Sequence, residues 1–147
     1  MGNVTPREYE VAFFAQTVWR LAHSSDENEL MAVACAVRNL VIPRPGTVPI
    51  YASFSEACED CLRIYPTRPR PVLTDIAFVS PNGLLAQIND VYDGTYPDVT
   101  ATQNHLAGAR YFSRVANLPD DDWFKQAIVN NAKHPLLGSW GSMQFYG

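Results

Sequence analysis

The first part of the chain repeats apolar side chains at the three- and four-residue spacing of an amphipathic helix. This stripe runs from Val11 to Ala22. Just before it, Thr5-Pro6-Arg7-Glu8 forms a capping box with proline at the first helical position. The pattern predicts a helix from about residue 6 to about His23, with its apolar stripe buried.

A nearly continuous apolar run, residues 30–37, predicts a second helix that is buried almost all round and therefore central. Residues 24–26, Ser-Ser-Asp, supply oxygens for its N-terminal cap, and Glu27 and Glu29 suit the positive end of its dipole. The helix must end before Pro43, because proline removes a backbone donor and disfavours helical geometry in the residue before it.

Prolines and glycines divide the remainder into shorter elements. Residues 53–56, Ser-Phe-Ser-Glu, are predicted to cap a third helix that continues through Leu62. A fourth helix is predicted to begin near Thr74 or Leu84 and to end at Asp93-Gly94, where glycine provides the usual left-handed stop.

The last third of the chain carries a different pattern. Two short aromatic segments flanked by glycine, residues 109–112 and 143–146, are predicted to pair as a small ribbon on the helical body. An acid-capped helix is predicted from about Asp121 to Ala132. We therefore expect a mainly α (α+β) fold in one domain spanning residues 1–147.

Composition and charge limit the class of protein. With 147 residues, 47% of them hydrophobic and 18% charged, the chain is too apolar to be disordered, and its apolar runs are too short for a membrane span. Eleven basic against fifteen acidic residues give a net charge of -4, so no nucleic acid partner is expected. The N-terminus lacks a secretion signal, which predicts synthesis as a soluble protein in the cytoplasm.

Motifs for nucleotide hydrolysis, zinc proteases and serine hydrolases are absent from the sequence. Cys35, Cys58 and Cys61 are an odd number, so a disulfide framework is not expected and buried thiols are. The pair at 58 and 61 has C-x-x-C spacing but no second pair to complete a zinc site, and no cofactor or metal is expected. Two alternatives stay open: a cysteine nucleophile with a distant histidine, and a redox or metal protein using Cys58 and Cys61.

Carboxylate chemistry remains, because one acid in a partly apolar cleft can protonate a glycosidic oxygen. Acids near the predicted helix junctions are Glu10, Asp26, Glu27, Glu29 and Asp98. Histidines that bear on a site are His23, His105 and His134, the last two in segments that cannot be regular helix. Aromatic residues that can stack on a sugar ring are Tyr111, Trp140 and Tyr146.

Several segments together resemble the cell wall hydrolases of the spore-cortex-lytic (SleB) type, a lysozyme-like family that cleaves peptidoglycan glycan strands. Met31-Ala-Val-Ala-Cys-Ala-Val-Arg-Asn39 resembles that family's apolar helix ending in asparagine. Ala86 through Gly94, followed by Asp98-Val-Thr100, resembles its A-x-x-x-V-x-x-G turn and D-x-T loop. Gly108-Ala-Arg-Tyr-Phe112 resembles its G-A-x-Y-F strand. Leu137-Gly138 and Phe145-Tyr146 resemble its closing I-G and F-Y, and Ser53-Phe54-Ser55 stands where the family has Q-F-S.

The resemblance implies a lysozyme-like helical domain with a small C-terminal β-ribbon, directed at peptidoglycan and using acid catalysis of the lysozyme or lytic transglycosylase class, without a cofactor. At the position of the family's general-acid glutamate the chain carries Leu21. A two-residue insertion places His23 and Glu27 on the family's two glutamates, so Glu27, with His23, is the candidate catalytic residue. The candidate substrate-binding residues are His105, Tyr111, Trp140 and Gln144.

Two functions follow from this resemblance. The first is a glycan-strand-cleaving enzyme with Glu27 as a relocated acid. The alternative is a catalytically inactive homologue, a glycan-binding or structural module, for instance in a phage-like particle or another protein assembly. In either case the site of action is the cell wall, reached after lysis or by delivery through a particle.

Overall fold

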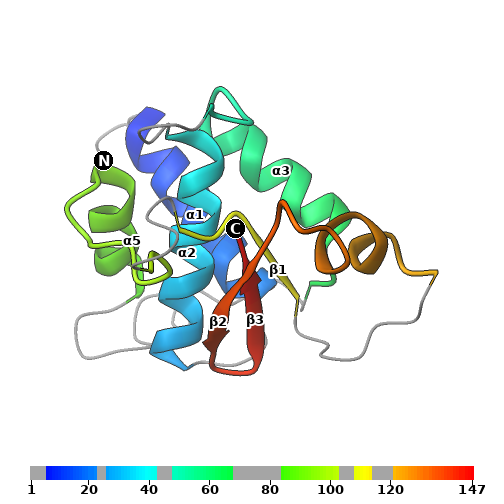
Figure 1. Cartoon of the computed structure of the whole chain (residues 1–147). Helices are drawn as coiled ribbons and strands as arrows, with labels where there is room; N and C mark the ends of the chain where they lie inside the picture. Colours follow the sequence, from blue (N-terminus) through cyan, green and yellow to red (C-terminus); the bar gives the residue numbers. More distant parts are fainter. Residues whose placement is uncertain (1–5, 23–25, 43–47, 68–83, 103–107, 114–120) are drawn as a thin grey trace, which may run out of the picture.

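The computed structural model describes residues 6–22, 26–42, 48–67, 84–102, 108–113 and 121–147. The helical body is built from α1 (Pro6–Leu21), α2 (Glu27–Val41), α3 (Phe54–Ile64) and α5 (Leu84–Asp93). In Figure 1, α2 crosses the middle of the molecule with α1 behind it, and α3 and α5 lie on opposite sides. The bounds of α1 and α2 confirm the two N-terminal helices expected from the apolar spacing.

The helix ends follow the predicted capping chemistry where the structure describes them. Asp26 caps α2, its side chain accepting hydrogen bonds from the amides of Asn28 at 2.8 Å and Glu29 at 3.4 Å. Ser53 caps α3 through the amide of Glu56 at 3.2 Å. Gly94, with φ +82°, follows the last residue of α5. The capping box at residue 5, the serines at 24 and 25 and the alternative start near residue 74 lie outside the described residues.

The core forms around α2. Every side chain from residue 30 to residue 37 is buried, and α2 contacts α1, α3, α5 and two strands of the sheet. Leu21, at the end of α1, is 1% exposed and belongs to this core. The prediction that the second helix is central is therefore confirmed.

Within the described residues, three strands from the last third of the chain form one antiparallel sheet (Figure 1). They are β1 (Tyr111–Ser113), β2 (Leu136–Trp140) and β3 (Met143–Tyr146), in the order β1-β3-β2. Tyr111 pairs with Tyr146 and Phe112 with Phe145, so the predicted ribbon between these two segments is confirmed. Strand β2 was not expected, because its side chains are mostly half-buried or exposed and its register is irregular between Leu136 and Gly138.

The predicted helix near residue 121 is present but shorter than expected. The amide of Phe124 donates to the Asp122 side chain at 2.9 Å, and the following turns are π-helical in η1 (Lys125–Val129). The helix ends early because Asn131 forms a turn of its own, accepting a hydrogen bond from the amide of Lys133 at 3.0 Å. The segment packs on the sheet through Phe124, which together with Ile128 and Tyr146 forms a second small cluster.

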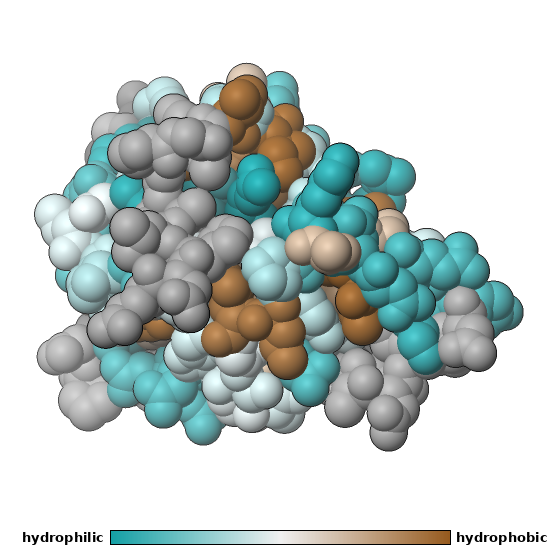
Figure 2. All heavy atoms as spheres, viewed as in Figure 1, coloured by the Kyte–Doolittle hydropathy of each residue, from teal (hydrophilic) through white to brown (hydrophobic). Residues whose placement is uncertain are grey.

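Apolar side chains also reach the surface. Figure 2 shows brown hydrophobic groups on one face, separated by hydrophilic and intermediate residues. Large hydrophobic residues that are exposed include Ile50, Ile64 and Trp123. No described helix is long and apolar enough to cross a membrane.

Candidate functional site

A hollow of about 200 Å³ opens among the C-terminal part of α2, the segment before α3, α3 itself, strand β1 and the start of the helix that contains η1. We call it the aromatic hollow, because four of its lining residues are aromatic. They are Tyr51, Tyr65, Tyr111 and Trp123. The rest of the lining is apolar except for one arginine, and consists of Leu40, Ile50, Cys61, Ile64 and Arg110. A small concave site with apolar walls and few polar groups is the usual form of a ligand pocket.

The rings of the aromatic hollow are held by ring contacts behind and beside them. Tyr65 stacks on Phe112 of β1 with a centroid distance of 4.3 Å and an interplanar angle of 20°. Trp123 lies 6.3 Å from Tyr65 and 5.4 Å from Phe124, and is 48% exposed. Tyr111 packs edge-on against His134 at 4.8 Å. The hollow therefore presents rings in fixed orientations to a ligand, with Trp123 open to solvent.

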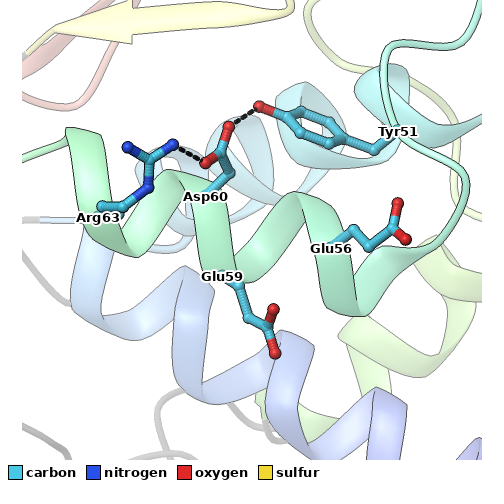
Figure 3. A pocket seen from close by; sticks show the side chains of 5 residues that line it. All are labelled: Tyr51, Glu56, Glu59, Asp60 and Arg63. Carbon is cyan, nitrogen blue, oxygen red and sulfur yellow. Dashed lines mark hydrogen bonds and ion pairs between the residues drawn. The ribbon is translucent and has the colours of Figure 1, made fainter.

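A second hollow, of about 460 Å³, lies beside α3 and shares Tyr51 with the first. We call it the acidic hollow; Tyr51, Glu56, Glu59, Asp60 and Arg63 line it (Figure 3). The Tyr51 hydroxyl and the Arg63 guanidinium both donate to the Asp60 carboxylate. Glu59 points away from this group in Figure 3.

These hydrogen bonds set the charge state of the acidic hollow. The pKa of Asp60 is lowered, first by the Tyr51 hydrogen bond and then by Arg63. Burial and the same hydrogen bond raise the pKa of Tyr51. Asp60 is therefore ionised at neutral pH and cannot supply a proton to a leaving group.

A buried hydrogen-bond network joins three segments that are distant in sequence. The Asn39 amide at the end of α2 donates to Asp98 Oδ2 at 2.7 Å and to the carbonyl of Ala109 at 2.9 Å. Asp98 Oδ1 accepts from the Thr100 amide at 2.9 Å and from its hydroxyl at 2.6 Å. Thr100 Oγ1 in turn accepts from the Ala109 amide at 2.8 Å. Gly108 has φ +75° and lies so close that a Cβ there would overlap the Asp98 carboxylate.

A second buried contact joins the start of α2 to the turn between β2 and β3. Glu29 is fully buried, and one carboxylate oxygen accepts from the Ser142 amide at 2.8 Å and from its hydroxyl at 2.5 Å. A Cβ at the neighbouring Gly141 would come within 2.6 Å of the Glu29 side chain. Glu29 therefore fastens the tip of the hairpin to the helix.

The structure describes one of the two residues predicted to be catalytic. His23 lies outside the described residues. Glu27 is exposed at the first turn of α2, where its carboxylate accepts a hydrogen bond from the Gln87 amide. A helical rise of about 1.5 Å per residue puts about 20 Å between Glu27 and Leu40, which lines the aromatic hollow. Glu27 therefore lies toward the opposite end of α2 from that hollow.

The predicted substrate-binding residues that the structure describes lie on three different strands of the sheet. Tyr111 lines the aromatic hollow. Trp140 is half-buried in β2 beside the hairpin tip, with its ring 5.4 Å from that of Phe145. Gln144 accepts a hydrogen bond from the Tyr146 hydroxyl at 3.1 Å. His105 lies outside the described residues, so the structure places Tyr111 alone of this set in the lining of the hollow, among the residues it describes.

Sequence reasoning did not single out Tyr51, Tyr65, Trp123 or Arg110. They come from four separate segments, and no local spacing connects them. The signal that was present was weak: Tyr65 directly follows an amphipathic helix, and Trp123 stands beside Phe124 at the start of another. Only the tertiary fold brings the four together.

The cysteines behave as buried thiols, as expected. Cys35, Cys58 and Cys61 are all buried, and none of them forms a disulfide. Burial raises the pKa of Cys58 and of Cys61 to about 12, so neither thiol is activated at neutral pH. Within the described ranges, no three histidine, cysteine or acidic side chains are grouped so that they could hold a metal ion.

Comparison with known proteins adds no relative. No family model matches the chain, and no curated protein or solved structure gives a match.

Proposed function

We propose that this protein is a peptidoglycan-directed, lysozyme-like module that binds glycan strands in the aromatic hollow without cleaving them. The observation that carries the proposal is the hollow itself. Its three tyrosines and Trp123 surround an open space of about 200 Å³. Sugar rings present flat faces of C–H groups, and aromatic side chains with fixed orientation bury such faces while their polar atoms remain available for hydrogen bonds.

The network around Asp98 supports the link to peptidoglycan. Its members, Asn39, Asp98 with Thr100, and Gly108 with Ala109, belong to three of the segments that resemble the cell wall hydrolases. Short motifs that match by chance have no reason to meet in space. Here a close approach of Gly108 to Asp98 and Asn39 joins all three, which favours a common structural origin over coincidence.

The positions of the acids favour binding over cleavage. Leu21, at the family's acid position, is 1% exposed and packed in the core. Glu27 is exposed and distant from the aromatic hollow, and Asp60 beside the hollow is held ionised. Loss of a general acid typically lowers a rate by about 10²- to 10⁴-fold. Neither Glu27 nor Asp60 can therefore donate a proton to a sugar bound in the aromatic hollow.

Co-sedimentation with purified sacculi tests the proposal. We expect the wild-type protein to bind sacculi and to release no muropeptides. Trp123→Ala removes an exposed ring from the hollow and should weaken binding by about tenfold, equivalent to about 1.4 kcal/mol. Tyr9→Ala is the matched control, because Tyr9 is 69% exposed on α1 and does not line the hollow. Equal retention of both variants would contradict the site.

The same assay also tests the catalytic interpretation. Release of muropeptides by the wild type, lost in Glu27→Gln, would support a cell wall hydrolase with Glu27 as its acid. Absence of wild-type binding to sacculi, with or without product, would contradict the whole proposal.

A further inference from the structure

Arg110 is the charged residue in the lining of the aromatic hollow, and its charge is not neutralised within the described part of the chain. Its backbone amide is fixed by the carbonyl of Tyr146 at 3.0 Å, at the entry to β1. Its side-chain Nε is buried without a hydrogen-bond partner, and no described residue forms an ion pair with it. Burying a guanidinium donor without a partner costs free energy, which a ligand that accepts its hydrogen bond would recover.

The surroundings favour an anion at this point. Asp60 lies beyond Tyr51 in the acidic hollow, and its charge is already balanced by Arg63 and by the Tyr51 hydroxyl. The walls next to Arg110 are apolar or aromatic, so an ion pair formed there is weakly screened. An arginine also pairs with a carboxylate through two parallel hydrogen bonds, which adds directional specificity.

We propose that the aromatic hollow binds a carboxylate-bearing group, with Arg110 pairing the carboxylate and the aromatic rings covering the adjacent flat or apolar part. The inference rests on the proposed function and narrows its ligand. A volume of about 200 Å³ is small for a ligand pocket and suits one ring or one short side group. In peptidoglycan this chemistry has two sources: the lactyl carboxylate of a muramic acid from which the stem peptide has been removed, and the C-terminal carboxylate of a stem peptide.

Ligand-observed NMR of the binding of three small probes to the whole protein distinguishes these two sources. The probes are N-acetylmuramic acid, D-alanyl-D-alanine and the neutral sugar N-acetylglucosamine. We expect at least one of the two carboxylate probes to bind about tenfold more tightly than N-acetylglucosamine, and this preference to fall when salt is raised. Whichever carboxylate probe is preferred identifies the source.

Arg110→Gln should remove the preference, whereas Arg110→Lys keeps the charge and the aliphatic stem and should retain part of it. Arg63→Gln is the matched control, because Arg63 pairs with Asp60 outside the aromatic hollow and should leave the preference unchanged. If Arg110→Gln loses the preference but Arg110→Lys keeps it, a general folding defect does not explain the loss.

The inference is overturned if the neutral sugar binds as tightly as both carboxylate probes, or if Arg110→Gln keeps the wild-type preference. Retention on sacculi distinguishes this failure from that of the proposed function. Wild-type protein that binds sacculi with no carboxylate preference contradicts the role of Arg110 alone. Wild-type protein that fails to bind sacculi contradicts the proposed function as well.

Discussion

Gly108 combines a positive φ with the closest approach of a neighbouring side chain among the glycines that the structure describes. Its φ of +75° disfavours any other residue, and a Cβ would overlap the Asp98 carboxylate and approach Asn39 Nδ2 to 2.8 Å. We predict that Gly108→Ala lowers the free energy of unfolding by about 2–4 kcal/mol. Urea denaturation followed by circular dichroism measures the change.

Gly94→Ala provides the matched control for this prediction. Gly94 has a similar φ of +82°, but the atom nearest to its Cβ is the far end of the flexible Arg38 side chain at 2.9 Å. We expect Gly94→Ala to lower the free energy of unfolding by about 1 kcal/mol, because it strains the backbone but causes little steric conflict. Equal losses in the two variants would show that the network around Asp98 is not tightly packed.

Asn39 joins α2 to that network by donating to Asp98 and to the Ala109 carbonyl. We predict that Asn39→Asp costs about 3–5 kcal/mol at pH 7 and more than Asn39→Ala, because it places a second carboxylate beside Asp98. The two carboxylates repel each other in the folded state, and a proton bound to either one relieves that repulsion. The deficit of the aspartate variant should therefore shrink as the pH falls toward 4, whereas that of the alanine variant should not, as urea denaturation at both pH values would show.

Glu29 holds the turn of the β2–β3 hairpin against α2. Loss of this contact should loosen the hairpin more than the rest of the molecule. Glu29→Ala removes the acceptor of the Ser142 amide and hydroxyl and leaves a buried space, so we predict a loss of about 2–4 kcal/mol. Faster amide exchange in β3 should accompany it, measured by hydrogen exchange with NMR. Glu27→Ala, two residues earlier and exposed, should change stability by about 0.5 kcal/mol or less.

Most of the helices and strands could be predicted, because capping residues, prolines and glycines in the sequence indicate where they begin and end. Asp26 and Ser53 cap the helices they were expected to cap, and the glycine-flanked ribbon pairs Phe112 with Phe145. Strand β2 could not be predicted, because it is held by pairing with β3 and its own apolar pattern is weak. Its tip is fixed by Glu29, a contact between residues 113 positions apart.

The candidate site was less predictable than the fold, because it is a property of the whole molecule. Tyr111 was identified from its aromatic segment and does line the aromatic hollow. Tyr65 and Trp123 line the hollow because α3 and the η1 segment converge on β1. Arg110 is a candidate ligand-binding residue because its Nε has no hydrogen-bond partner among the described residues. A sequence pattern predicts which residues cap a helix or face a core, but not which distant segments lie side by side in the fold.

The buried thiols allow a prediction about the stability of the whole chain. Burial raises the pKa of Cys58 and Cys61 from 9.0 to about 12, so the folded protein keeps both protons at a pH where the unfolded chain releases them. Their contribution to stability is full below about pH 9 and is lost as the pH rises toward 12. For two thiols this lowers the free energy of unfolding by about 3 kcal/mol between pH 8 and pH 10.

Urea denaturation at several pH values between 8 and 10 tests this expectation. Tyrosines of the unfolded chain also begin to ionise near pH 10, so the share of the thiols is measured by comparison with a variant that lacks both of them. The matched control is the double variant Cys58→Ala/Cys61→Ala, which should lose about 3 kcal/mol of the decline between pH 8 and pH 10. Each single variant should lose about half of it, because the two thiols have similar pKa values. Parallel declines in the wild type and the double variant would contradict the prediction, and would assign the pH dependence to groups other than the C-x-x-C pair on α3.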